Sequence, residues 1–531
     1  MGLTATAARA ARAGRARNAR AWDIPAFGPW PSDDDHHHVV IIGAGIGGLT
    51  AGALLAQRGL KVAVFEAHDR PGGFCSSWIR KVRLPQGVRK FTFDAGVQDF
   101  SGLGPRGPLR NLLRQLGAEA AIDWRRVHHR YWRDGLTFDV PARGEDIPQA
   151  LGRLFPAETT AIIAFFHEIE AVYREMYTDV ETTGGVPMAP TDPTELMAWP
   201  GRHPHAWRWM KQPFAVMLDS YLTDPNLKHL LTTLSEYLTE QPELLSVEDM
   251  APLYGYYFDG GYYPAGGAQR LAEVLARVIL ERGGQITFKS TVEAILTEGE
   301  RVVGVRCVGG KGSRAGLVVA NGDVVAMLTD LLDRSILPPS YLDWIGSLRR
   351  GPTAMLLSLA LDTVPDLPAR IFVSRDGFDF GIGNPSAIDT SLAPEGAAAL
   401  TMLRLLPEGE GALWRRGARD YRERKNAFAA QMIDATIDSV LPDLRRHILQ
   451  CDVATPETFA RYVRTRGGTI YGMARDQSCP HLHSPLPGLL LVGAGTTTGA
   501  GIEAVAVSGT LAANAVLPPQ AGPVIARHRA C

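Results

Sequence analysis

The chain has 531 residues, of which 45% are hydrophobic and 21% charged, which is enough for a globular protein of two or three domains. It carries 55 basic and 56 acidic residues, for a net charge of −1. No overall electrostatic field would therefore recruit nucleic acid, and the composition excludes a basic nucleic-acid-binding protein.

Residues 1–35 form a basic leader before the first predicted strand. Its first 22 residues contain no acid and five arginines, Arg9, Arg12, Arg15, Arg17 and Arg20. This composition resembles an organelle-targeting peptide or a basic arm for anionic lipid, and it lacks the apolar segment of a secretory signal. We predict a disordered leader, with organelle targeting as an alternative.

Just after the leader, the chain reads V-V-I-I-G-A-G-I-G-G, a β-branched run that opens into a G-x-G-x-x-G motif. A helical stretch and a second apolar run, residues 62–65, follow, and this run ends at Glu66. Gly43 permits the tight turn, Gly45 lets a pyrophosphate approach the backbone, and Gly48 lets the helix pack on the strand. Glu66 is placed to bind ribose hydroxyls, so the unit is predicted to bind a dinucleotide.

A membrane-spanning segment is the rival interpretation of this region. Residues 39–57 contain no charge, and their number is near the lower limit for a transmembrane helix. Their five glycines and the strand that follows favour the dinucleotide site. Because no other stretch approaches a transmembrane helix, any membrane contact is predicted to be peripheral.

A second glycine motif, Arg70-Pro71-Gly72-Gly73, follows Glu66. Its spacing resembles that of the second glycine motif in glutathione-reductase-type FAD proteins, and this resemblance favours FAD over NAD. Adjacent glycines allow a loop to pass close to a cofactor, and Arg70 can offset phosphate charge.

Two later segments repeat the order of strand, glycine turn and helix. One covers residues 260–284 and the other residues 488–515, where a buried strand opens into Gly493-Ala494-Gly495-Thr496. Such turns direct backbone N–H groups toward an anionic or flat group. We therefore predict one nucleotide-binding domain that is discontinuous in sequence, made of residues 36–109, 259–329 and 480–518.

The two blocks between these segments differ from them in character. Residues 110–258 are aromatic-rich and largely helical by periodicity, whereas residues 330–479 mix strands, such as residues 354–361, with a long helix at 421–441. We predict that both blocks form an interleaved α+β substrate domain, so the fold class is α/β with a Rossmann-like domain. A ligand cleft is expected where the two domains meet.

Residues 200–218 combine basic and aromatic side chains and then become apolar. This pattern is typical both of a segment at a bilayer interface and of a core helix with a polar end. The five cysteines are far apart, without the C-x-x-C pair or the spacing of a zinc site. They predict reduced thiols in a cytoplasmic protein, and no metal site is predicted.

Several motifs occur in one order along the chain: the glycine fingerprint with Glu66, the Arg70–Gly73 motif, Phe93-Asp94-Ala95-Gly96, Tyr263-Pro264-Ala265-Gly266-Gly267, Val319-Ala320-Asn321-Gly322-Asp323 and Leu491-Val492-Gly493-Ala494-Gly495-Thr496. With these motifs the chain resembles the phytoene desaturase and carotenoid isomerase family, which includes the retinol saturases, over about residues 38–516. The resemblance implies a glutathione-reductase-type FAD domain and a hydrophobic tunnel for a long polyene.

The resemblance also implies a function and a set of cofactor-binding residues. The implied enzyme is an FAD-dependent oxidoreductase that desaturates, saturates or isomerises carbon–carbon double bonds in a polyene or isoprenoid lipid. Its predicted FAD contacts are Gly43, Gly45, Gly48, Glu66, Ala67, Arg70, Gly72, Gly73, Val292, Gly493, Ala494, Gly495, Thr496, Gly501 and Ile502.

Glu503 is a departure from the desaturase pattern, which carries Pro-Gly where this chain has Glu503-Ala504. It is a candidate catalytic acid beside the flavin, and stabilisation of a helix N-terminus is its alternative role. Two other functions stay open on the same scaffold: a flavin amine oxidase, and a prenyl-lipid escort without flavin chemistry.

Overall fold

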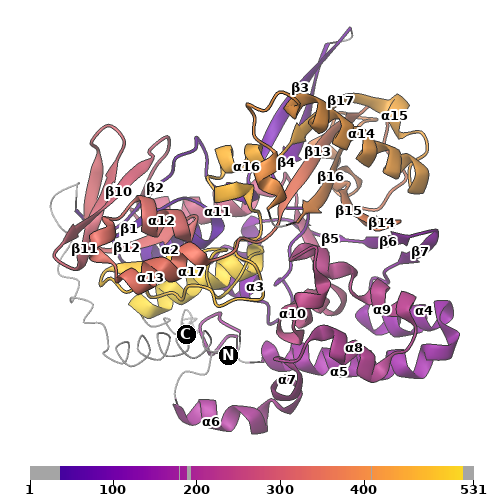
Figure 1. The fold of residues 1–531 in the computed structure, drawn as a ribbon, viewed down its shortest axis with the longest axis horizontal. Helices are drawn as coiled ribbons and strands as arrows, with labels where there is room; N and C mark the ends of the chain where they lie inside the picture. Colours follow the sequence, from indigo (N-terminus) through magenta and orange to yellow (C-terminus); the bar gives the residue numbers. More distant parts are fainter. Residues whose placement is uncertain (1–35, 86, 179, 188–192, 408, 518–531) are drawn as a thin grey trace, which may run out of the picture.

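The structure is a computed structural model that describes residues 36–85, 87–178, 180–187, 193–407 and 409–517. The predicted basic leader and Cys531 lie outside the described residues. Figure 1 shows a first sheet with its helices beside a second sheet, and a helical region that lies below the second sheet. The predicted α/β fold class is confirmed by this arrangement.

The first sheet has seven strands in the order β10-β11-β12-β1-β2-β9, and β18 also pairs with β12. The strands are β1 (His36–Ile42), β2 (Val62–Phe65), β9 (Gln285–Thr287), β10 (Val292–Glu298), β11 (Arg301–Cys307), β12 (Gly312–Asn321) and β18 (Leu489–Val492). Strands β1, β2 and β18 are rich in valine, isoleucine and leucine and are almost completely buried, and so are residues 317–320 at the end of β12. Such apolar runs are typical of a parallel sheet that is covered on both faces.

Three distant parts of the chain meet in this sheet. Strand β12 is parallel to both β1 and β18, with Ile42 opposite Ala320 and Ala320 opposite Leu491. The turns that follow these strands therefore begin at the same edge of the sheet, although they are separated by hundreds of residues. Parallel strands bind ligands at this carboxyl edge.

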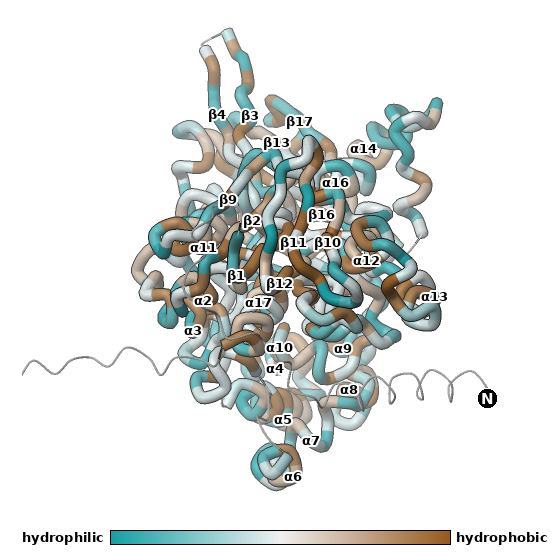
Figure 2. The backbone as a smooth tube through the Cα atoms, turned by 90° about the vertical axis from the view of Figure 1, so that its left-hand side faces the viewer, coloured by the Kyte–Doolittle hydropathy of each residue, from teal (hydrophilic) through white to brown (hydrophobic). Residues whose placement is uncertain are grey.

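Helices cover both faces of the first sheet, as Figure 2 shows. On one face lie α2 (Ile46–Gln57), α3 (Pro108–Gln115), α11 (Gln269–Glu281) and α17 (Ile502–Val516); on the other lie α12 (Val324–Asp330) and α13 (Pro339–Ser347). Helix α13 was predicted in the substrate domain, but its Ile345 packs with Val318 and Leu489 of the first sheet. The predicted boundary after residue 329 is therefore too early, because α12 and α13 bury their apolar faces together against this sheet.

The second sheet also has seven strands, in the order β17-β13-β16-β15-β14-β6-β7. They are β6 (His129–Arg133), β7 (Leu136–Asp139), β13 (Thr353–Leu361), β14 (Arg370–Arg375), β15 (Phe378–Gly383), β16 (Ala398–Leu406) and β17 (Ile448–Ala454). Helices α14 (Tyr421–Ser439) and α15 (Leu444–His447) pack on it, and α16 (Pro456–Tyr462) lies at its edge near the first sheet.

Strands β6 and β7 fall in the block that was predicted to be largely helical. Buried Tyr131 lies between Arg130 and Trp132, and buried Phe138 lies between Thr137 and Asp139, so the pattern of this short stretch has the period of a strand. The long-range pairing of β6 with β14 ties the helical region to the second sheet.

Two two-stranded sheets connect these parts. One is the projecting hairpin of β3 (Ser77–Leu84) and β4 (Gly87–Asp94), at the top of Figure 1. The other pairs β5 (Trp124–Val127) with β8 (Gly261–Pro264). The strand predicted before α11 is therefore real, but it pairs with β5 and not with the first sheet.

The helical region encloses an aromatic-rich core. Its helices are α4 (Ile147–Leu154), α5 (Thr159–Met176), α6 (Pro193–Arg202), α7 (Pro204–Trp209), α8 (Phe214–Tyr221), α9 (Pro225–Leu231) and α10 (Val247–Phe258), with the short helix η5 (Thr233–Tyr237). The described helices include none that has both the length and the apolar composition needed to cross a membrane.

Candidate cofactor and substrate site

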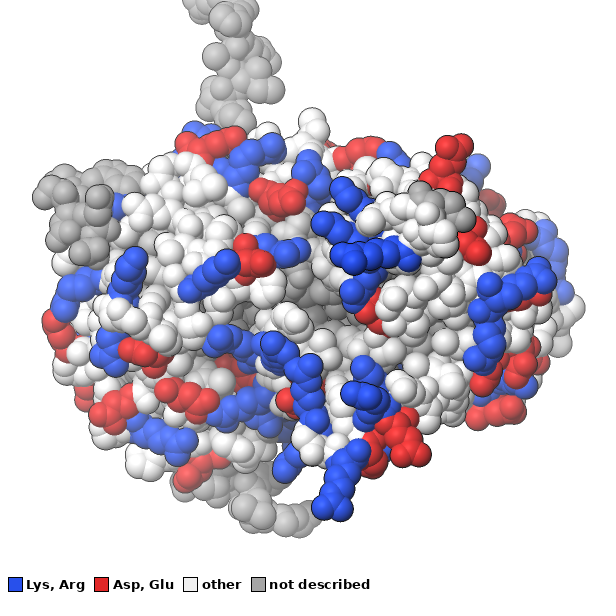
Figure 3. Space-filling view, turned by 90° about the horizontal axis from the view of Figure 1, so that it is seen from above, with Lys and Arg blue, Asp and Glu red and all other residues white. Residues whose placement is uncertain are grey.

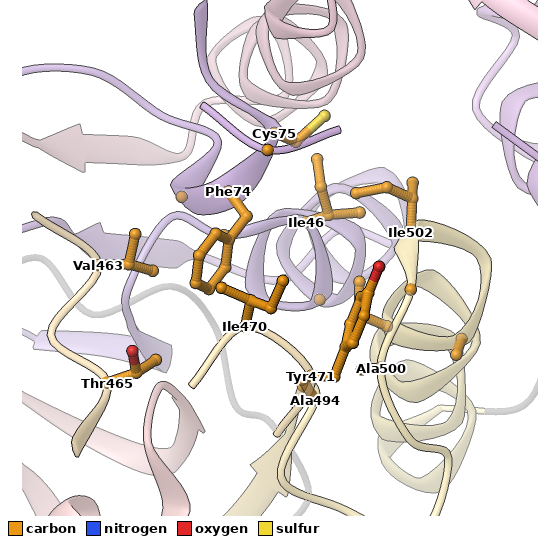
Figure 4. Close-up of a pocket in the computed structure, with 18 of the residues that line it drawn as sticks. Ile46, Phe74, Cys75, Val463, Thr465, Ile470, Tyr471, Ala494, Ala500 and Ile502 are labelled. Carbon is orange, nitrogen blue, oxygen red and sulfur yellow. The ribbon is translucent and has the colours of Figure 1, made fainter. Parts of the chain in front are cut away.

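A cavity of about 1950 Å³ runs between the carboxyl edge of the first sheet and the second sheet. Cavities for a single small ligand usually measure about 300 to 1000 Å³, so this one has room for two large ligands. Figure 4 shows part of its wall, in which Ile46, Phe74, Ile470, Tyr471 and Ile502 surround the open space. These side chains come from four separate parts of the chain.

The first glycine turn leaves the sheet at Gly43, which has a φ of +89°. A Cβ atom built there would lie 2.4 Å from the carbonyl oxygen of Asn321 at the end of β12. Glycine is therefore required both by the backbone conformation and by the close approach of the two strand ends. Helix α2 begins three residues later, so the N–H groups of its first turn lie at the cavity.

Glu66 lies at the end of β2, as predicted, and both of its carboxylate oxygens face backbone donors. The amide N–H of Ala44 donates to Oε2 at 2.7 Å, and that of His68 donates to Oε1 at 2.7 Å. The carboxylate thus fixes the glycine turn in place. Each oxygen keeps a further lone pair for a ribose hydroxyl, because a carboxylate oxygen accepts two hydrogen bonds.

The second glycine motif packs directly on the first. Gly72 donates its N–H to the carbonyl oxygen of Ala44 at 2.7 Å, and a Cβ on Gly73 would lie 3.6 Å from Cα of Gly45. Arg70 lines the cavity, but its guanidinium donates to the carbonyl oxygen of Ser77 and to Asp69. Its expected contact with phosphate therefore competes with contacts that hold the loop.

The third turn follows β18 and faces the other two. Gly493 donates its N–H to Oγ of Ser508 at 3.0 Å, and Thr496 donates its hydroxyl to the carbonyl oxygen of Gly493 at 2.8 Å. Helix α17 begins at Ile502 after Gly501, whose φ is +104°. The turn and this helix start lie beside the first turn of α2, since a Cβ on Gly47 would lie 3.1 Å from the carbonyl oxygen of Val505 and 3.5 Å from Cα of Gly493.

The structure brings most of the predicted cofactor residues to this cavity. Those that line it are Gly43, Gly45, Glu66, Ala67, Arg70, Gly72, Gly73, Val292, Gly493, Ala494, Thr496, Gly501 and Ile502. Gly48 and Gly495 lie behind its wall: a Cβ on Gly48 would be 2.5 Å from the oxygen of Gly43, and one on Gly495 would be 3.0 Å from Val324. Both positions serve close packing.

Asn321 was not among the predicted contacts, although its motif was. Its Nδ2 donates to the carbonyl oxygen of Gly43 at 3.1 Å, and its Oδ1 would lie 3.1 Å from a Cβ on Gly493. The side chain thus stands between the first and third turns. Its place at the end of a buried strand was the signal that could have revealed it.

Asp94 explains why two of the sequence motifs occur together. Its buried carboxylate accepts hydrogen bonds from Ser77 Oγ at 2.5 Å, Tyr263 OH at 2.6 Å and the amide of Ala268 at 3.0 Å. Burial raises the pKa of this carboxyl, and the three hydrogen bonds oppose the rise. Asp94 therefore joins the end of β4 to the start of α11, which is a structural role.

Glu503 lies in the first turn of α17 and lines the cavity. Ser101 donates its hydroxyl to Oε2 and Tyr177 donates to Oε1, both at 2.6 Å. Burial raises the pKa of Glu503, the nearby Asp259 adds to the rise, and the two hydrogen bonds oppose it. The residue is thus held by the substrate side of the cavity as well as by its own helix.

A buried polar cluster on the substrate side was not predicted. The side chain of Asp99 is 0% exposed, and its Oδ2 lies 2.7 Å from His129 Nε2 and 2.7 Å from the hydroxyl of Tyr237. Arg370 donates Nε to the same hydroxyl at 3.3 Å, and its guanidinium lies 4.2 Å from the ring centre of Phe372. These residues come from four separate segments, because only Arg370 and Phe372 share a strand, so spacing along the chain gave no signal for the cluster.

Basic side chains also surround the cavity. Figure 3 shows lysine and arginine side chains around a hollow on the upper face of the molecule. The basic residues that line the cavity are Arg70, Arg80, Lys211, Arg370, Arg464, Arg466 and Arg475. Four of them are paired with carboxylates that also line the cavity, Arg80 with Asp452, Lys211 with Glu248, Arg466 with Asp330 and Arg475 with Asp249, so the wall carries both signs of charge.

Comparison with known proteins agrees with this geometry. Residues 46–365 match the model of the flavin-containing amine oxidoreductase family. The chain is 27% identical to a 4,4'-diapophytoene desaturase of Methylomonas sp over 90% of this chain and 94% of that protein. It is 25% identical to the chloroplastic prolycopene isomerase of Daucus carota over 90% and 79%. The resemblance to carotenoid desaturases and isomerases is therefore confirmed.

Solved structures show the same fold. An oxidoreductase from Methanosarcina mazei superposes with a TM-score of 0.62 at 18% sequence identity, over 89% of this chain and 99% of that one. The family match confirms FAD as the cofactor, and the shared fold agrees with a Rossmann-like FAD-binding domain. The glycine turns, the first turn of α2 and Glu66 fit that group, because they offer N–H donors, close backbone approach and a ribose acceptor.

Proposed function

This chain belongs to the flavin-containing amine oxidoreductase family, and we propose that it acts on carbon–carbon double bonds of a long hydrophobic polyene or isoprenoid lipid. The observation that carries the proposal is the cavity, which continues from the glycine turns to a wall of leucines and tyrosines from the second sheet and the helical region. The carotenoid desaturase and isomerase relatives, which span nearly the whole chain, support the same substrate class.

In this proposal some residues bind FAD, and others exclude water from the site and orient the substrate. Glu66 accepts hydrogen bonds from the ribose, and the first turn of α2 donates to the pyrophosphate. FAD supplies hydride or electron transfer when it is bound. Phe74, Ile470 and Tyr471 exclude water from the site and orient an apolar chain against it.

Glu503 has a further place in the proposal. Its carboxyl group lies at the wall of the cavity, where Ser101 and Tyr177 fix it. We propose that this carboxyl tunes the electrostatics near the reacting group.

The amine oxidase alternative has less support from the side chains. Tyr237 and Tyr256 both line the cavity, but their rings are stacked with centroids 4.9 Å apart, so no amine fits between them. The guanidinium of Arg370 already lies 5.4 Å from the ring centre of Tyr237. A second cation at this ring would be repelled.

The test is to incubate the purified holoprotein anaerobically with 4,4'-diapophytoene, with prolycopene and, as the competing class, with putrescine. We expect a change in the polyene by chromatography, with flavin bleaching if hydrogen is removed from it. Turnover of putrescine without turnover of either polyene would contradict the proposal. A purified protein that contains no FAD and still binds the polyene would instead support the lipid-escort function.

A further inference from the structure

Glu236 is a carboxylic acid in the cavity wall whose side chain makes no hydrogen bond or ion pair with any described residue. It lies on η5 in the helical region and lines the cavity together with its neighbours Tyr237 and Leu238. The residue is half-buried at the cavity wall. An acid without a protein partner in a ligand cavity is available to a ligand or to a reaction step.

The surroundings of Glu236 place it near the predicted flavin contacts. Tyr471 donates its hydroxyl to the backbone oxygen of Glu236 at 3.4 Å. The next residue, Gly472, packs on the third glycine turn, since a Cβ there would lie 2.0 Å from the oxygen of Ala494. Two contacts, one between Glu236 and Tyr471 and one between Gly472 and Ala494, therefore connect Glu236 to the third glycine turn, which is predicted to face the cofactor.

Charged side chains on four strands of the second sheet affect the protonation of Glu236 electrostatically. Arg133 on β6, Arg370 on β14 and Arg404 on β16 favour its charged form, whereas Asp379 on β15 opposes it. Burial is the largest effect, and with Asp379 it raises the pKa of Glu236 to about 8. The carboxyl is therefore mostly protonated at neutral pH and can exchange its proton in the physiological range.

Glu236 and Glu503 differ in their hydrogen-bond partners, and this difference decides which of them is the better candidate for proton exchange. Both oxygens of Glu503 accept hydrogen bonds, from Ser101 and Tyr177, so its carboxyl is held by protein groups. The carboxyl of Glu236 has no such donor among the described residues, and the residue lines the cavity. We propose that Glu236 is a catalytic residue that exchanges a proton with a carbon atom of the bound substrate, an inference that rests on the proposed function.

The step balances for either direction of the reaction. When hydrogen is added, a hydride bonds to one carbon of the double bond, the π electron pair takes the proton at the other carbon, and the O–H bond of Glu236 breaks to leave a carboxylate. A reduced flavin, when bound, would supply this hydride and lose its two electrons. When hydrogen is removed, the carboxylate takes the proton from one carbon, the pair of that C–H bond becomes the π bond, and the other carbon releases a hydride, which bound oxidised FAD would accept.

The experiment compares Glu236→Gln, which is nearly isosteric but cannot exchange a proton, with Glu243→Gln, which removes an exposed carboxyl from the next short helix, Pro242–Leu244. The holoproteins are first titrated by infrared spectroscopy. We expect a protonated carboxyl band that disappears near pH 8 in the wild type and in Glu243→Gln, and that is missing in Glu236→Gln. A wild type without this band, or a band that Glu236→Gln retains, would overturn the assignment.

Turnover of 4,4'-diapophytoene and prolycopene is then measured from pH 6 to 9. We expect Glu236→Gln to keep its FAD and to lose about a hundredfold or more in rate, without the change near pH 8 that the wild type shows. Glu236→Asp should recover part of the rate. If the wild type turns over a polyene and Glu236→Gln does so equally well, the inference fails alone; if the wild type turns over no polyene, the proposed function fails first.

Discussion

The two walls of the cavity are built in different ways. The wall on the first sheet consists of glycine turns and helix starts, in which backbone groups such as the N–H of Ala44 and the carbonyl of Gly43 make the decisive contacts. The wall on the second sheet consists of side chains, with Asp99, His129 and Tyr237 brought together from separate elements. A wall of backbone tolerates few side chains, whereas a wall of side chains depends on each partner being present.

This difference predicts which substitutions do most damage on each side. At the wall on the first sheet, a substitution should be destabilising when it adds side-chain atoms. At the wall on the second sheet, a substitution should be destabilising when it removes them. The predictions below test that contrast, beginning with the largest expected effect.

Gly43→Val should be the most damaging change at the backbone wall. The side chain would combine a φ of +89° with a 2.4 Å clash against the carbonyl of Asn321. We expect a loss of at least about 4 kcal/mol of stability, with little FAD retained. The measurements are flavin absorbance per protein and the thermal midpoint.

Gly59→Val is the matched control for this prediction. It has a φ of +90°, but a Cβ there meets no atom within 4 Å. We expect a cost of about 1 to 2 kcal/mol with FAD retained. Equal losses in the two variants would show that backbone strain alone, and not the close approach of the strands, decides the effect.

Asp99→Ala should be the most damaging change at the side-chain wall. It would leave the ring of His129 and the hydroxyl of Tyr237 buried without their acceptor. Breaking such a buried pair costs about 3 to 5 kcal/mol. Urea unfolding of the wild type and the variant measures the difference.

The matched control is Asp139→Ala, which breaks the pair with Arg130 where the aspartate side chain is 64% exposed. An exposed pair contributes about 0 to 1 kcal/mol. If Asp99→Ala were as mild as this control, the polar cluster would not be holding the second wall together.

Glu66→Ala tests the one place where a side chain matters at the backbone wall. It removes the acceptor for Ala44 and His68 and the predicted acceptor for the ribose. We expect FAD to bind about ten- to a hundredfold more weakly, from a loss of about 1.5 to 3 kcal/mol. Fluorescence titration of the apoprotein measures this, and unchanged affinity would contradict the predicted role of Glu66.

The smallest effect is expected from Glu503, where the two walls meet. Burial raises its pKa in the folded protein, so its contribution to stability is present at low pH and is lost as pH rises through the raised pKa. Glu503→Gln has no such titration. Relative to this variant, the wild type should therefore lose stability above pH 4.5, by about 1.4 kcal/mol for each unit of pKa difference. Parallel curves in urea unfolding from pH 4.5 to 8 would contradict this.

The sequence by itself determined the cofactor side of the molecule. Two apolar runs predicted strands, and the glycines that end them, Gly43 and Gly493, predicted turns, because these conformations favour those residue types. The acid at Glu66 predicted the ribose acceptor. The order of the motifs also identified the relatives. Asn321 stood in one of these motifs, yet its contact with Gly43 needed the pairing of β1 with β12.

Tertiary structure alone decided the substrate side. Asp99, His129, Tyr237 and Arg370 belong to different elements, and each is an ordinary residue in its local context. The same holds for Glu236, because neither its open side chain nor its raised pKa follows from its neighbours in the chain. Local sequence, through its glycines and apolar runs, determines backbone conformation, whereas the burial and the partners of a side chain are determined only when distant segments pack together.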